Sequence, residues 1–102
     1  MKITLPREYL AYLKDGSDAG ETEGEPGYFQ LWHPGEVEAL NQSYQVAEYA
    51  PGFLGFGSDG GGEMLAFDAA GAVFKIPFVG MAPEEAQKIA DSWIEVVSRI
   101  TS

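Results

Sequence analysis

Apolar residues recur at helical spacing near both ends of the chain. Leu5, Tyr9 and Leu13 follow this spacing, and we expect a first helix over residues 6–14. A longer stripe after Pro83 predicts a helix that continues to the end of the chain, because its members repeat every three or four positions. The stripe consists of Ala86, Ile89, Ala90, Trp93, Val97 and Ile100.

Between these helices, short apolar and aromatic runs bounded by glycine and proline predict strands. The predicted strands cover residues 28–32, 53–57, 63–67 and 72–76. A short middle helix is expected over residues 36–42, where Val37 and Leu40 share one side. Residues 15–27 hold almost no apolar side chain, and they are predicted to form an exposed loop.

The last two strands predict a hairpin in which Leu65, Phe67, Phe74 and Ile76 share one face and Lys75 lies opposite. Tight turns between consecutive strands favour antiparallel pairing. The predicted fold class is α+β: an antiparallel sheet of about four strands with an N-terminal helix, a short middle helix and a long C-terminal helix. We expect one domain over residues 1–102.

Charge narrows the classes of partner. Six basic and sixteen acidic residues give a formal net charge of -10, which disfavours nucleic acid and anionic membranes as partners. The chain has no cysteine, no apolar run of membrane-spanning length and no apolar signal segment at its start. We therefore expect a cytoplasmic protein, while the sequence leaves its oligomeric state open.

Acidic side chains are concentrated in one part of the chain, since no Lys or Arg occurs between Lys14 and Lys75. One interpretation is a solvated acidic loop, and the other is a docking surface for a basic protein. The predicted partner-binding residues are Asp15, Asp18, Glu21, Glu23, Glu25, Asp59 and Glu63. Tyr28 and Trp32 are candidate aromatic anchors, although such residues more often belong to a core.

Motifs for catalysis or cofactor binding fail on inspection. Gly55, Gly57 and Gly60 fit a dinucleotide-binding pattern, but a strand is predicted after them in place of the required helix. Asp59 and Glu63 lack the spacing of a calcium loop, although a looser Ca²⁺ site stays open. His33 is the only histidine, and no nucleophile motif surrounds it. We predict no catalytic residue, metal or cofactor.

The order of several motifs resembles the SUKH superfamily, in the group related to the yeast cell-wall-assembly regulator. The opening helix, a central segment from Tyr49 to Glu63, the following hairpin and the stretch from Gly80 to Trp93 are similar to those of the family. The resemblance implies an α+β fold and, for bacterial members, immunity proteins that neutralise toxins, many of them nucleases. It implies no catalytic residues.

The leading hypothesis is a non-catalytic immunity protein that docks an acidic surface on a basic toxin domain such as a nuclease. Three alternatives remain at this point: a cytoplasmic regulatory scaffold like the yeast relative, a small-ligand or Ca²⁺ binder at Asp59 and Glu63, and a hydrolase that uses His33.

Overall fold

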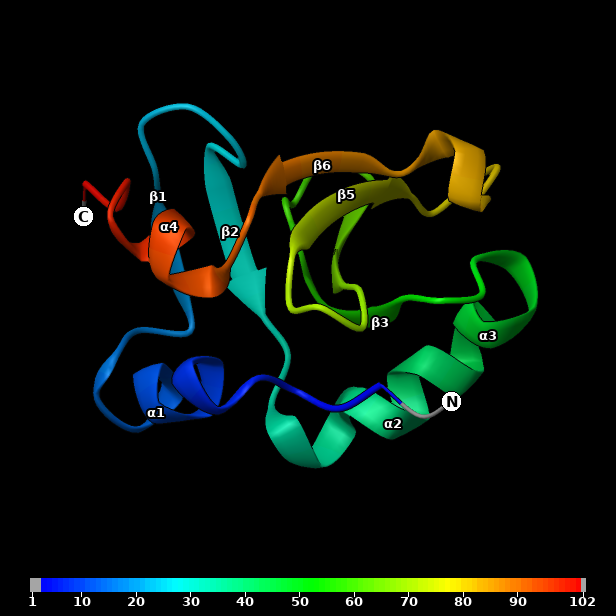
Figure 1. Ribbon diagram of the computed structural model, residues 1–102, viewed down its shortest axis with the longest axis horizontal. Coiled ribbons are helices and arrows are strands. Elements are labelled where there is room, and N and C mark those ends of the chain that lie inside the picture. Colours follow the sequence, from blue (N-terminus) through cyan, green and yellow to red (C-terminus); the bar gives the residue numbers. More distant parts are fainter. Residues whose placement is uncertain (1–2, 102) are drawn as a thin grey trace.

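Within residues 3–101, which the computed structural model describes, the chain forms one antiparallel sheet of six strands (Figure 1). Each strand pairs with the next along the chain. The strands are β1 (Ala19–Glu21), β2 (Tyr28–Leu31), β3 (Leu54–Ser58), β4 (Glu63–Phe67), β5 (Val73–Pro77) and β6 (Gln87–Ala90). The α+β class and the antiparallel sheet are confirmed. The expected number of about four strands is wrong, because β1 and β6 flank the four that were predicted.

Helices connect and cover the strands. Those of the described chain are α1 (Arg7–Asp15), α2 (Pro34–Ser43), α3 (Val46–Tyr49), the 3-10 turn η1 (Pro83–Glu85) and α4 (Trp93–Val97). Two of them, α1 and α2, lie where the first and middle helices were predicted. Helix α2 begins earlier than expected because Pro34 fits a first helical turn and His33 Nδ1 accepts the Gly35 N–H at 3.1 Å.

The long C-terminal helix is wrong. After η1 the chain extends into β6, which pairs with β5, and only Trp93–Val97 is α-helical. Pairing with β5 outweighs the helical spacing of the apolar residues, because tertiary contacts routinely override local propensity. Ser92 marks the new start, since its hydroxyl accepts the Glu95 N–H at 3.3 Å.

The predicted exposed loop over residues 15–27 contains the edge strand β1. Ala19 pairs with Gln30 and Glu21 pairs with Tyr28. The sequence Ala-Gly-Glu has too little apolar alternation to indicate a strand. It becomes a strand because it pairs with β2, which local sequence does not reveal. The outer side of β1 is also covered, because Thr22 forms an antiparallel bridge with Ile100 and Thr101 N–H donates to the Glu21 carbonyl at 2.9 Å.

The β4–β5 hairpin has a register one residue away from the predicted one. Leu65 lies opposite Lys75, while Met64 lies opposite Ile76. Phe74 and Ile76 therefore face away from Leu65 and Phe67, and the four do not share a face. Lys75 points to the other face from Phe74 and Ile76, as predicted, but it shares its face with Leu65, which contradicts the prediction. The error arises because both faces of these strands carry apolar residues, so alternation alone leaves the register undetermined.

Each face of the sheet carries its own hydrophobic cluster. We call the side covered by α1 and α4 the closed face and the side covered by α2 and α3 the open face. The closed face centres on Tyr9, whose ring centroid lies 5.0 Å from those of both Phe56 and Trp93. The open face buries Val46 and Ala50 of the α3 region against Met64, Ala66 and Ile76.

Candidate functional site

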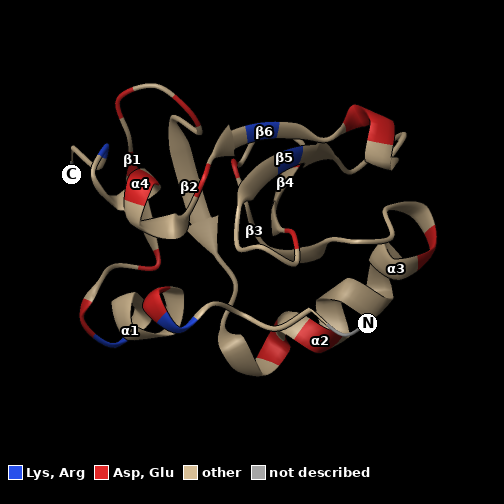
Figure 2. Ribbon diagram, in the orientation of Figure 1, with Lys and Arg blue, Asp and Glu red and all other residues tan. Residues whose placement is uncertain are grey.

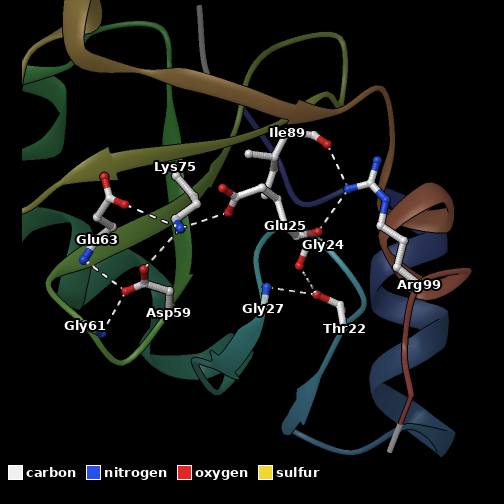
Figure 3. Close-up of polar contacts among 10 residues, drawn as sticks. All are labelled: Thr22, Gly24, Glu25, Gly27, Asp59, Gly61, Glu63, Lys75, Ile89 and Arg99. Carbon is white, nitrogen blue, oxygen red and sulfur yellow. Dashed lines mark hydrogen bonds and ion pairs between the residues drawn. The ribbon is translucent and has the colours of Figure 1, made fainter.

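Three of the seven predicted binding carboxylates converge on Lys75 of β5 (Figure 3). Lys75 Nζ lies 2.9 Å from Glu25 Oε1, 3.3 Å from Asp59 Oδ2 and 3.4 Å from Glu63 Oε1. The acidic residues come from the β1–β2 turn, the end of β3 and the start of β4. We call these four residues the Lys75 cluster.

A glycine turn fixes Asp59 in the cluster. Asp59 Oδ1 accepts the Gly61 N–H at 2.8 Å and the Glu63 N–H at 3.1 Å, which leaves Oδ2 to face Lys75. Gly60 and Gly62 have φ values of +76° and +102°, a backbone conformation that favours glycine. The segment is thus a turn between two strands, as predicted, and no helix follows to bind a nucleotide phosphate.

Charge and partial burial compete within the Lys75 cluster. The side chains of Lys75 and Asp59 are 11% and 13% exposed. Burial on its own raises the pKa of Asp59, but hydrogen bonds from Gly61, Glu63 and Lys75 outweigh it and keep this pKa below its ordinary value. Burial on its own lowers the pKa of Lys75, and Glu25 and Asp59 more than offset this and raise it. The Asp59 carboxylate and the Lys75 ammonium therefore form an ion pair at neutral pH.

The geometry speaks against the calcium alternative. The Lys75 ammonium occupies the place between Asp59 and Glu63 where a bound cation would have to lie. The other oxygen of Asp59 is already bonded to two backbone N–H groups. Residues 3–101 offer no group of three or more His, Asp or Glu placed to hold a metal.

The other four predicted residues, Asp15, Asp18, Glu21 and Glu23, do not join the Lys75 cluster. They are exposed, they follow the end of α1, strand β1 and the turn after it, and they pair with no cation of the described chain. We call this surface the acidic rim. The ribbon in Figure 2 is coloured red at Asp and Glu positions along this path, and Lys14 of α1 is the nearest cation in sequence.

The turn that connects the rim to the Lys75 cluster is held by hydrogen bonds. Thr22 Oγ1 donates to the Gly24 carbonyl at 3.0 Å and accepts the Gly27 N–H at 2.9 Å. The Glu23 N–H donates to the Arg99 carbonyl at 2.8 Å. What the sequence presents as an acidic loop is therefore a bonded edge of the sheet.

Arg99 is a second cationic centre. Its Nη1 donates to the carbonyls of Ile89 at 2.8 Å and Glu25 at 3.0 Å (Figure 3). Its Nη2 lies 2.7 Å from Glu95 Oε2. It therefore joins β6 to the β1–β2 turn, elements from opposite ends of the sheet. The roles of Arg99 and Lys75 were not predicted from the sequence. With only six basic residues among sixteen acidic ones, each buried or half-buried cation could have been expected to pair with carboxylates.

Most of the negative charge on the described surface is not balanced by nearby Lys or Arg side chains. Lys75, Lys88 and Arg99 are in ion pairs, which involve five of the sixteen carboxylates. The other eleven pair with no cation in residues 3–101. The acidic balance of the sequence is therefore expressed at the surface.

A broad groove of about 1070 Å³ lies between residues 3–5, helices α2 and α3, and residues 51–54. Its lining is mostly apolar, and Glu38 and Glu48 are the ionisable side chains among its described lining residues. His33 lies outside it, exposed at the end of β2, where its ring caps α2. The described lining of the groove contains no His, Lys or Arg.

The fold, the Lys75 cluster and the acidic rim define a small α+β domain with a strongly acidic, ordered surface. The chain matches the model of the SMI1/KNR4 family (SUKH-1) over residues 1–99, and it belongs to that family. This confirms the resemblance found in the sequence. No curated protein matches the chain. In the described residues no helix has the length and apolar character needed to cross a membrane.

Proposed function

We propose that this domain is a non-catalytic, immunity-type binding protein that neutralises a toxin by docking the acidic rim on the toxin's basic face. The observation that supports it most is the rim itself: four exposed carboxylates without cationic partners in the described chain, with Glu21 in strand β1 and Glu23 in the hydrogen-bonded turn after it. Membership of the SUKH-1 family supports the immunity-type class.

Order in the rim favours binding. A flexible acidic loop loses conformational entropy when a partner orders it, and this loss weakens affinity. Here Thr22 and Arg99 already fix the turn, so less entropy is lost on docking. Unpaired surface charge also accelerates encounter with a basic partner, most strongly at low salt.

The Lys75 cluster has a supporting role in this proposal. Lys75 binds the side chain of Glu25 and Arg99 binds its backbone carbonyl, so the two cations hold the end of the rim against the sheet. Glu25 and Glu63 remain 46% and 37% exposed, which leaves them available at the border of a docked partner. None of these groups needs to act as an acid or a base.

The test reverses charge on the rim and measures the association rate. Immobilised wild-type protein captures its partner from cells of its source, mass spectrometry identifies the partner, and stopped-flow kinetics follow binding of the purified pair. Glu21→Lys with Glu23→Lys should lower the association rate by roughly tenfold at low ionic strength, with a weaker salt dependence.

Glu8→Lys with Asp91→Lys is the matched control, because it changes net charge equally at two positions outside the acidic rim, one on α1 and one after β6. It should reduce the rate much less than the rim variant. Equal rates for the wild type and the rim variant would remove the rim from the docking mechanism. A partner whose activity the domain leaves unchanged would reject the immunity-type function.

A further inference from the structure

Three aromatic side chains from separate segments meet at the surface of the open face. Trp32 follows β2, Tyr44 ends α2 and Phe78 follows β5. The rings of Trp32 and Tyr44 are nearly parallel, with their centroids 5.9 Å apart. The ring centroids of Tyr44 and Phe78 are 4.7 Å apart. Val79 beside them is 91% exposed and Tyr44 is 43% exposed. We call these four residues the aromatic patch.

Backbone contacts hold the patch in place. Trp32 N–H donates to the Phe56 carbonyl at 2.9 Å, and Phe78 N–H donates to the Gly62 carbonyl at 3.0 Å. The Trp32 ring packs over Gly55, where an added Cβ would lie 3.2 Å from its Cζ3 atom. The backbone is therefore held at Trp32 and Phe78, and the Trp32 ring packs on the sheet.

The patch also has unused hydrogen-bonding atoms. The Trp32 indole N–H and the Tyr44 hydroxyl form no hydrogen bond with the described chain, whereas the Tyr12 hydroxyl donates to the Ser17 carbonyl. Rigid, partly exposed Trp and Tyr side chains with a free polar group are typical of binding hot spots.

Charge around the patch selects the kind of partner. The elements that lead into and out of it, α2, α3 and η1, carry carboxylates and no Lys or Arg (Figure 2). Their acidic residues are Glu36, Glu38, Glu48, Glu84 and Glu85. Lys75 lies on the opposite face of β5 and is engaged by three carboxylates. An aromatic surface in a negative field attracts cations, and guanidinium groups also stack on aromatic rings.

We propose that the aromatic patch binds an arginine-bearing surface of the basic partner, with a guanidinium group stacked on Tyr44 and Trp32. This rests on the proposed function only for the basic character of the partner. A second copy of the chain is disfavoured as the occupant, because both copies would carry a formal charge of -10.

The experiment titrates ¹⁵N-labelled protein with an octa-arginine peptide and follows amide and indole signals by NMR. The chain has two tryptophans, of which Trp93 is fully buried, so the two indole N–H signals separate the patch from the core. The Trp32 indole and the amides of Tyr44, Phe78 and Val79 should shift, while the Trp93 indole should stay. Octa-lysine should bind several-fold more weakly, because an ammonium group does not stack.

Tyr44→Ala should weaken octa-arginine binding by about 3- to 10-fold, which is the range of a partly exposed cation–π contact. Val79→Ser is a second patch variant with little risk to folding, since its side chain is solvent-exposed. Ile94→Ala is the matched control, because Ile94 is 58% exposed on α4 of the closed face. It should leave the affinity unchanged.

Each outcome decides the proposal. Shifts at the patch that Tyr44→Ala reduces and Ile94→Ala does not would support it. Shifts confined to residues 15–23, with the Trp32 indole unmoved, would overturn it and leave the acidic rim as the docking surface. Concentration-dependent dimerisation through the patch, measured by sedimentation, would identify a second copy as the occupant and overturn it as well. Absence of any shift would overturn it too, whereas the acidic rim is tested separately by the association rates of the charge-reversal variants.

Discussion

The two faces of the sheet differ in how completely they are covered. On the closed face, Tyr9, Phe56, Phe67 and Trp93 are all fully buried and touch one another edge-on or stacked. On the open face the aromatic residues are only partly covered, as they lie at the border of a smaller buried cluster. The closed face therefore supplies stability, and the open face leaves aromatic surface available for recognition.

The strongest test of this contrast removes one large ring from each face. Phe56→Ala on the closed face should lower the free energy of unfolding by about 3–5 kcal/mol, through lost burial and the cavity that remains. Tyr44→Ala on the open face should lower it by less than about 1 kcal/mol, because its ring is 43% exposed. Urea unfolding followed by circular dichroism measures both. Similar losses for the two variants would contradict the division of roles.

A second test removes the cation of the Lys75 cluster. Lys75 lies on the closed face, on the same side of the sheet as Leu65. Lys75→Met should destabilise the protein by about 1–3 kcal/mol, since it leaves three carboxylates close together without a cation. Lys88→Met serves as the control, because its ion pair with Asp91 is exposed and should contribute little. Equal effects in urea unfolding would show that the Lys75 cluster is an ordinary surface feature.

A smaller effect is expected from pH. Because the folded-state pKa of Asp59 lies below its ordinary value of 3.8, its stabilising contribution is present above that value and is lost as pH falls through the folded-state pKa. Asp59→Asn keeps the acceptor for the Gly61 and Glu63 N–H groups but removes the charge. The difference in unfolding free energy between wild type and Asp59→Asn should therefore shrink from pH 5 towards pH 2. A constant difference would mean that the charge of Asp59 does not contribute.

The smallest expected change is a gain in stability from a substitution on the closed face. The Tyr9 hydroxyl is buried without a hydrogen-bond partner in the described chain, and burial raises the pKa of this phenol. Tyr9→Phe should raise the free energy of unfolding by up to about 1 kcal/mol, because an unsatisfied polar group leaves the core. A higher midpoint in thermal unfolding supports this. A lower midpoint would indicate that the hydroxyl makes a bond that stabilises the fold.

Local patterns predicted the parts of the fold that depend on local interactions. Pro6, Pro34 and the Gly60–Gly62 turn mark element boundaries that the structure retains. The pattern failed over residues 83–101, where helical spacing of apolar residues coexists with pairing of β6 to β5. Such pairing depends on the rest of the sheet, which a local window does not contain.

The candidate site shows the same division. Asp59 and Glu63 were placed correctly beside a glycine turn, because five consecutive residues determine that geometry. Their meeting with Glu25 at Lys75 depends on the order and register of four strands, since Glu25 and Lys75 are fifty positions apart in sequence. Periodicity indicates which residues are apolar, and it leaves such long-range ion pairs undetermined.

The bridge between Thr22 and Ile100 has a consequence for the behaviour of the protein at high concentration. An uncovered outer strand offers free N–H and C=O groups to other chains, which promotes fibril growth. Here the last described residues cover the outer side of β1, and the guanidinium of Arg99 occupies a carbonyl of β6. These contacts leave fewer free backbone groups on the two outer strands for a strand of another chain to pair with.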